Sequence, residues 1–204
     1  MRKILAVVLC LIMLLSTTCF AADFSDLASE HWAYKNVMNL VDKGIVSGYP
    51  DGTYRPDKTI TRGEFFKLIM VAMDGEEIFE LPKKLAKTWA EPYMKYAESQ
   101  GLMMNGTTTE DIDSNMTRLE MAVVLSKVAT YKKIEKAYSD DGMGVVETTT
   151  FNDVSSLSEM EQRYIQSVAD LGLIRGYSDG SFKPNNSMTR AEIATVIYRF
   201  LTIK

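Results

Sequence analysis

Apolar residues recur with helical spacing at three places along the chain. Each stripe occupies the i, i+3 and i+4 positions, or two of these three, so its side chains share one face of a helix. The stripes are Val37, Leu40 and Val41; Met94 and Ala97; and Ile165, Val168 and Ala169. Each stripe therefore predicts a helix with one buried face.

A glycine follows each stripe, where a left-handed residue usually ends a helix. These glycines are Gly44, Gly101 and Gly172. A loop comes next, and in the first and third copies it contains an Asp-Gly pair, in which Asp51 and Asp179 are typical turn formers. Pro56 and Pro184 then oppose a continuing strand. The pattern predicts loops without a sheet.

A second helix begins at a Thr-Arg-x-Glu motif that occurs three times. Thr at the N-cap with Glu three residues later is the pattern of a capping box. The pairs are Thr61 and Glu64, Thr117 and Glu120, and Thr189 and Glu192. Strongly apolar runs follow, such as "FFKLIMVAM". The chain is therefore expected to be mainly all-α, with three copies of a helix–loop–helix unit.

The spacing of the copies also predicts the organisation of the chain. The three copies cover residues 22–75, 76–131 and 151–204, and the second is divergent. Residues 132–150 are charged and then rich in Gly and Thr, which indicates a linker. The last helix ends close to the last residue, so we expect no further domain after it.

The first 21 residues have the pattern of a secretory signal peptide. Met1-Arg2-Lys3 precedes an apolar run that is too short for a permanent membrane span. Small residues at Cys19 and Ala21 predict cleavage before Ala22. Lipid attachment at Cys19 is the alternative, and the preceding Ser16-Thr17-Thr18 disfavours it.

Cleavage changes the composition in two ways. Both cysteines precede Ala22, so a mature chain has no disulfide or thiolate metal site. The loss of Arg2 and Lys3 from 23 basic residues leaves 21 against 27 acidic ones, a net charge of −6. Nucleic acid is therefore not an expected partner, because its binding proteins usually carry a basic excess.

The arginine of each motif stands at the first helical position, where a cation is electrostatically unfavourable. One interpretation of Arg62, Arg118 and Arg190 is an anion site, in which the guanidinium and the free N–H groups of the first turn bind one carboxylate or phosphate. The other is an internal ion pair with Asp26, Asp153 or the motif's own glutamate. Both interpretations hold together if an internal acid orients the guanidinium towards an external anion.

Two tryptophans occupy equivalent positions in the first and second copies. Trp32 and Trp89 are expected in the core, and the alternative is a platform on which a sugar ring stacks. His31 has no accompanying ligand or nucleophile pattern. We find no catalytic motif, metal-ligand spacing or cofactor signature, so we expect a binding protein without cofactor or metal rather than an enzyme.

The segment "FSDLASEHWAYKNVMNLVDKGIVSGYPDGTYRPDKTITRGE" strongly resembles an S-layer homology domain, and "GYSDGSFKP" with "MTRAE" repeats the pattern in the third copy. The resemblance implies three units in a pseudo-threefold domain around a central helix bundle. It also implies a secreted protein at the bacterial cell wall or surface. The implied ligand is a cell-wall polysaccharide that carries pyruvate ketals and binds in grooves between units.

The resemblance implies that the motif arginines bind the pyruvate carboxylate. The residues implicated in ligand binding, from the motifs and from this resemblance, are Arg62, Arg118, Arg190, Gly48, Gly176, Trp32, Trp89, Asp26, Asp153 and Ser47. The second loop, "NGTTTEDID", is one residue shorter than the others, and Met160 replaces the tryptophan in the third copy. We therefore expect one or two working grooves rather than three.

Two other functions remain open from the sequence. The chain would be a structural or interaction protein of the envelope, which self-assembles or binds a protein partner, if the fold is kept but the grooves are inactive. It would be an envelope enzyme if a pair of carboxylates without a local signature were catalytic.

Overall fold

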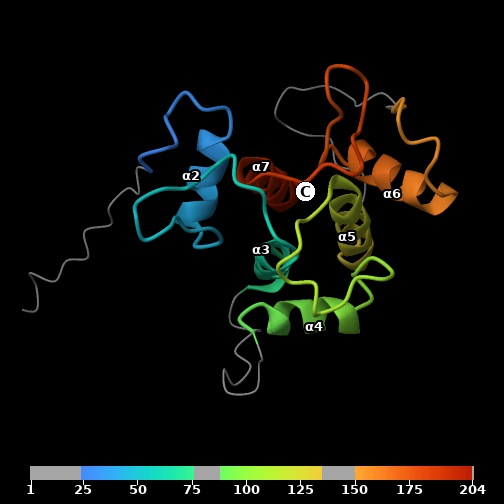
Figure 1. The fold of residues 1–204 in the computed structure, drawn as a ribbon, viewed down its shortest axis with the longest axis horizontal. Coiled ribbons are helices and arrows are strands. Elements are labelled where there is room, and N and C mark those ends of the chain that lie inside the picture. The colour runs from blue at the N-terminus through green and yellow to red at the C-terminus, as the bar shows by residue number, and fades with distance from the viewer. Residues whose placement is uncertain (1–23, 76–87, 135–149, 204) are drawn as a thin grey trace, which may run out of the picture.

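Six α-helices form the framework of the described residues, 24–75, 88–134 and 150–203, in this computed structural model (Figure 1). The helices are α2 (Tyr34–Asp42), α3 (Arg62–Asp74), α4 (Glu91–Ser99), α5 (Arg118–Tyr131), α6 (Glu159–Asp170) and α7 (Arg190–Thr202). The described residues form isolated β-bridges but no sheet, which confirms the all-α expectation. The expected signal peptide and most of the 132–150 linker lie outside the described residues.

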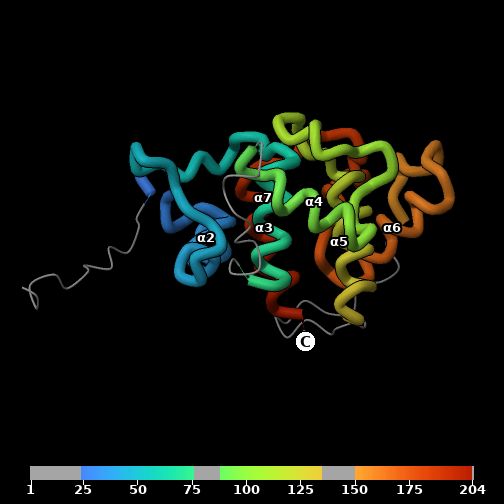
Figure 2. The backbone as a smooth tube through the Cα atoms, turned by 90° about the horizontal axis from the view of Figure 1, so that it is seen from below, coloured from blue at the N-terminus to red at the C-terminus, as the bar shows by residue number. Residues whose placement is uncertain are grey.

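The helices form three helix–loop–helix units, which we call unit 1 (24–75), unit 2 (88–134) and unit 3 (150–203). The first helix of each unit packs on the second helix of another unit: α4 on α3, α6 on α5, and α2 on α7. Helices α3, α5 and α7 lie in the middle, and α2, α4 and α6 lie outside them (Figures 1 and 2). Because α2 packs on α7, the units close into a ring.

A cycle of three backbone hydrogen bonds joins the units at the centre of the ring. The Ile60 N–H donates to the Met188 carbonyl (2.9 Å), the Met188 N–H to the Met116 carbonyl (3.1 Å), and the Met116 N–H to the Ile60 carbonyl (2.9 Å). Each residue directly precedes a motif threonine and is almost fully buried. Unit 2 therefore occupies an equivalent place in the ring, although its loop differs.

The three expected capping boxes are present. In each, the threonine hydroxyl accepts from the glutamate N–H, and the glutamate carboxylate accepts from the threonine N–H. The glycines expected at the helix ends have positive φ, with values of 69° at Gly44, 66° at Gly101 and 70° at Gly172. A further capping box at Ser158 and Glu161 begins α6. The starts of α3, α5, α6 and α7 are thus set by local chemistry.

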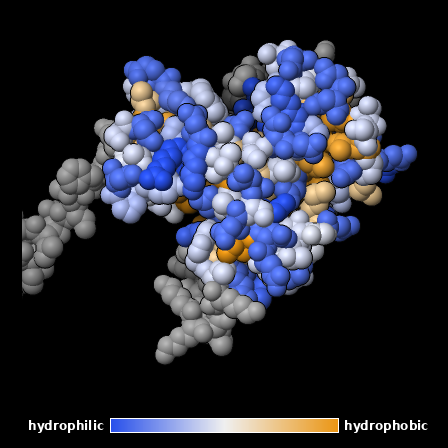
Figure 3. All heavy atoms as spheres, viewed as in Figure 1, coloured by the Kyte–Doolittle hydropathy of each residue, from blue (hydrophilic) through white to orange (hydrophobic). Residues whose placement is uncertain are grey.

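The predicted apolar stripes face the core. Val37, Leu40, Met94, Ala97 and Ile165 are at most 1% exposed. The surface seen in Figure 3 is mostly hydrophilic, with apolar residues gathered in a few patches. Because α2, α4 and α6 pack on helices of other units, burial of these stripes contributes to the contacts between units.

Candidate ligand-binding groove

The starts of the three motif helices are occupied by the fold itself. The first two N–H groups of each helix donate to carbonyl groups in the loop of the following unit, at 2.8–3.0 Å. The donor and acceptor pairs are Arg62 to Ser114 and Gly63 to Ile112, Arg118 to Asn186 and Leu119 to Pro184, and Arg190 to Lys58 and Ala191 to Pro56.

These contacts correct one part of the anion-site interpretation. With two N–H groups bound to the neighbouring unit and the third bound to the capping threonine, the first turn offers no free donors to an anion. Any anion must therefore be bound by the arginine side chains and by residues of the grooves.

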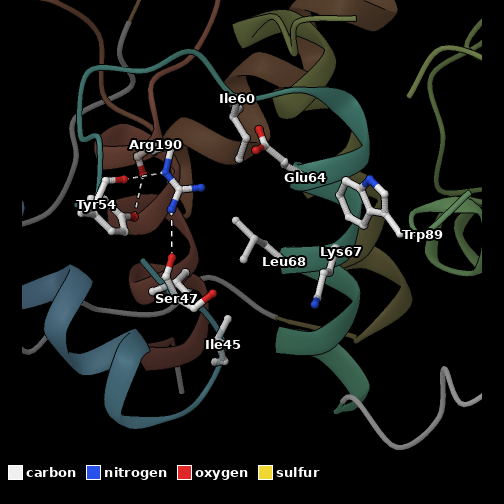
Figure 4. A pocket seen from close by; sticks show the side chains of 10 residues that line it. Ile45, Ser47, Tyr54, Ile60, Glu64, Lys67, Leu68, Trp89 and Arg190 are labelled. Carbon is white, nitrogen blue, oxygen red and sulfur yellow. Dashed lines mark hydrogen bonds between the residues drawn. The ribbon is translucent and has the colours of Figure 1, made fainter. Parts of the chain in front are cut away.

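The Arg190 side chain links unit 3 to the loop of unit 1. Its Nε donates to the Tyr54 carbonyl (2.9 Å) and its Nη2 to the Ser47 carbonyl (3.1 Å), as Figure 4 shows. Its guanidinium carbon lies 4.7 Å from the centre of the Tyr54 ring. Within the described part of the chain, Nη1 has no hydrogen-bond partner. Arg190 is thus held in place by two hydrogen bonds, which leave Nη1 as its one nitrogen not used in them.

A pocket of about 120 Å³ lies beside Arg190, between unit 1 and the start of α4. Its apolar lining comes from Ile45, Val46, Tyr54, Ile60 and Leu68, and its polar lining comes from Ser47, Glu64, Lys67 and Arg190, with Trp89 completing it. Figure 4 places Arg190 at one side of the pocket, Leu68 in the middle and Trp89 at the other side. All three units contribute to this groove.

Trp89 is 53% exposed and Trp32 is 61% exposed, so the expected burial of both tryptophans in the core was wrong. They directly precede the fully buried residues Ala90 and Ala33, which take the core position instead. The indole of Trp89 faces the pocket of Arg190, whereas Trp32 stacks against His31 with ring centres 5.5 Å apart. Exposed rings of this kind remain available for stacking.

Arg118 is buried at the junction of units 2 and 3. Its Nε donates to the Phe182 carbonyl (2.7 Å) and its Nη2 to the Arg175 carbonyl (3.0 Å). Only 4% of the residue is exposed, and it lies against the rings of Tyr177 and Phe182. Burial lowers the pKa of the Arg118 guanidinium. This arginine fastens the ring and is not accessible to a polysaccharide.

Arg62 is the only motif arginine of the described residues that is hydrogen-bonded to a carboxylate, whereas Nη1 of Arg118 lies 3.9 Å from Oε1 of Glu192. Its Nε donates to Oε1 of Glu120 at 2.7 Å, and the exposed fractions of the two side chains are 19% and 10%. The acid that pairs with it is neither Asp26 nor Asp153 nor its own motif glutamate. It is the motif glutamate of the next unit, which the sequence analysis did not consider.

Asp26 and Asp153 brace the loops of their own units. The Asp26 carboxylate accepts from the N–H groups of Tyr54 (2.7 Å) and Arg55 (2.8 Å). Asp153 accepts from the N–H groups of Phe182 and Lys183, both at 2.8 Å. Neither is hydrogen-bonded to a motif arginine, so the structure gives these aspartates a role in shaping the loops.

Gly48 and Gly176 are required by packing within each loop. A Cβ at Gly48 would lie 2.3 Å from the ring of Phe24, and one at Gly176 would lie 2.4 Å from the ring of Phe151. The adjacent Ser47 is exposed and offers its carbonyl to Arg190. Ser47 therefore belongs to the groove, whereas the two glycines support the loops behind it.

The described residues include no group of three or more His, Cys, Asp or Glu side chains placed to hold a metal ion. None of the described helices has the length and apolar character that crossing a bilayer requires.

The structure thus defines an all-α domain of helix–loop–helix units with a groove between units. Residues 23–66 and 150–194 match the model of the S-layer homology domain, and these two segments belong to that family. The matches include the loops and helix starts that form the Arg190 groove.

Several known proteins are similar to this chain. Cell surface glycoprotein 1 of Acetivibrio thermocellus is 33% identical over 168 residues, which cover 78% of this chain and 7% of that protein. The cellulosome-anchoring protein of the same organism is 33% identical over 173 residues, which cover 77% of this chain and 35% of that protein. Amylopullulanase of Thermoanaerobacterium thermosulfurigenes is 28% identical over 181 residues, which cover 87% of this chain and 9% of that protein.

The chain therefore spans only a small part of these relatives. The catalytic activity in the name of the amylopullulanase belongs to a protein of which this chain matches 9%. The family and the surface proteins among its relatives confirm the expected location at the cell wall or cell surface.

Proposed function

We propose that this protein anchors non-covalently to the cell envelope by binding a wall polysaccharide that carries pyruvate ketals. The groove between units 3 and 1 is the site, and unit 2 is a divergent S-layer homology repeat that completes the ring. The observation that carries the proposal is the pocket in which the unpaired Nη1 of Arg190 faces an apolar floor and the exposed Trp89.

The chemistry of the groove fits such a ligand. A ketal carboxylate accepts a charge-assisted hydrogen bond from a guanidinium, and this bond is stronger than one between neutral groups. A sugar ring has an apolar face for the indole and hydroxyl groups for polar partners such as Ser47 and Glu64. The pocket volume of about 120 Å³ suits part of one sugar unit rather than a long segment of chain.

Sedimentation with purified cell walls tests the proposal. Residues 22–204 are mixed with native walls and with walls stripped of ketals, and the bound fraction is measured. We expect Trp89→Ala to weaken binding at least tenfold, or by about 1.4 kcal/mol, without loss of the fold because Trp89 is exposed. Arg190→Lys keeps a charge but loses the planar donor group, and should also weaken binding.

Arg163→Ala is the matched control, because the Arg163 side chain is 74% exposed on α6 and lies outside the pocket. It should bind as the parent does. Binding that survives ketal removal and both groove substitutions would contradict the proposal.

A structural or interaction role in the envelope is the second candidate. It is favoured by Arg62 and Arg118, whose side chains are used in contacts between units. In that case the parent protein would fail to sediment with walls and would instead self-assemble or bind an envelope protein.

A further inference from the structure

Arg62 differs from the other two motif arginines in what it binds. Arg118 and Arg190 each use Nε and Nη2 to hold two carbonyl groups in the loop of the next unit. The loop that faces Arg62 belongs to unit 2 and is one residue shorter. There the same Nε and Nη2 are directed to the Glu120 carboxylate instead.

The Glu120 carboxylate serves two partners at once. Oε2 completes the capping box by accepting from the Thr117 N–H (3.0 Å), and Oε1 accepts from Arg62. The equivalent glutamate in the open groove, Glu64, has Oε1 3.4 Å from the Lys58 ammonium and makes no ion pair with Arg190. A carboxylate bound to Nε and Nη2 makes charge-assisted hydrogen bonds and neutralises the charge of the guanidinium, which a backbone carbonyl group does not do.

A second acid adds to the negative charge around Arg62. Hydrogen bonds from Thr108 lower the pKa of Asp111, and the nearby charge of Arg62 lowers it further. The charge of Arg62 therefore acts on two carboxylates, the bound Glu120 of α5 and, more weakly, Asp111 in the loop of unit 2. The negative charges of Glu120 and Asp111 would repel an incoming anion.

We propose that Glu120 is an internal carboxylate that closes the groove between units 1 and 2 to anionic ligands. The intact chain then binds one anionic group, at Arg190, and Arg62 is a latent second site that opens when the charge of Glu120 is removed. This inference rests on the proposed function, since it concerns the same kind of ligand.

The substitution Glu120→Gln tests this inference with little change in shape. Glutamine also serves at this position of a capping box, so the start of α5 is kept while the charge is lost. Glu192→Gln is the matched control, because it makes the same change in the box beside Arg118, which is only 4% exposed. Far-UV circular dichroism verifies that each variant is folded.

The probe is a methyl hexopyranoside that carries a single pyruvate ketal, titrated by calorimetry. We expect one bound probe per chain for the parent and for E192Q, and two for E120Q. Adding Arg62→Ala to E120Q should reduce the number of bound probes to one per chain again. In the parent, Arg62→Ala alone should change the affinity by less than twofold, which tests the inference even if E120Q does not fold.

The outcomes separate this inference from the proposed function. One bound probe in both the parent and E120Q, or more than one in the parent, overturns the inference and leaves wall binding intact. Loss of the parent's binding in Arg62→Ala also overturns it, because the functional site would then be at Arg62. A parent that binds no probe overturns both the inference and the proposed function.

Discussion

At the scale of single residues, the three motif arginines show how one sequence position acquires different roles. All three follow an N-cap threonine, yet their surroundings differ. Arg118 is buried, Arg62 is paired with a carboxylate, and Arg190 directs one nitrogen to the pocket. The differences come from the loop that each arginine meets. Those loops lie more than 40 residues away in the sequence, so the motif alone does not reveal them.

Arg118 should matter more for stability than for binding. Arg118→Ala removes charge-assisted hydrogen bonds to two carbonyl groups and leaves a buried space, so the free energy of unfolding should fall by about 2–4 kcal/mol. Urea unfolding followed by circular dichroism measures this. The control Arg163→Ala should stay within about 0.5 kcal/mol. An equal loss in both variants would contradict the role assigned to Arg118.

The turn aspartates should titrate at unusually low pH. Hydrogen bonds from Thr53 and Arg55 lower the pKa of Asp51 to about 2, and Ser181 does the same for Asp179, also to about 2. Since an unfolded aspartate has a pKa of about 3.9, this stabilisation is present above that pH and is lost as the pH falls towards 2.

Carboxyl NMR titration measures these values directly. In Thr53→Val, which removes the hydroxyl, the pKa of Asp51 should rise towards its ordinary value while that of Asp179 stays unchanged. A value near 3.9 for Asp51 in the parent would show that the turn does not form as described.

At the scale of the elements, the loops of units 1 and 3 each depend on close contact between a glycine and a phenylalanine ring. In Gly48→Ala the new Cβ would lie 2.3 Å from the Phe24 ring, which must therefore shift. We expect the free energy of unfolding to fall by about 1–3 kcal/mol. Chemical denaturation measures the change, with Ser47→Ala as the neighbouring control, for which we expect about 0.5 kcal/mol or less.

The effect on the groove follows from the same contact. The loop of Gly48 carries the carbonyl groups that hold Arg190, so a shifted loop should also weaken wall binding. A Gly48→Ala protein with the parent's stability would contradict the packing described for this loop.

At the scale of the whole molecule, the ring closes through contacts between the first and the last helix of the described chain, α2 and α7. Leu40 on α2 is fully buried, and α2 packs on α7. Leu40→Ala should lower the free energy of unfolding by about 2–5 kcal/mol. Because each unit depends on its neighbours, unfolding should remain a single transition.

Circular dichroism and tryptophan fluorescence, recorded on the same samples, test whether unfolding is a single transition. Trp32 and Trp89 report from the segments just before α2 and α4, whereas circular dichroism reports all helices. Coincident transitions are expected, and separate midpoints would show that the units unfold independently.

The sequence by itself determined the helices, their capping boxes, the glycines at helix ends and the existence of three similar units. These features depend on residues within a few positions of one another, where spacing and cap chemistry act directly. The turn-forming role of Asp51 and Asp179 was predictable for the same reason. The family resemblance also followed from motifs of this local kind.

Only the tertiary structure decided which unit each helix packs on, which acid pairs with Arg62, and that Trp32 and Trp89 are exposed. It also showed that the helix N–H groups are bound to neighbouring loops and are not free for an anion. These outcomes depend on competition among groups that are distant in the sequence but adjacent in the ring. A local pattern can present an arginine, but the opposing loop decides whether a carbonyl, a carboxylate or an open pocket receives it.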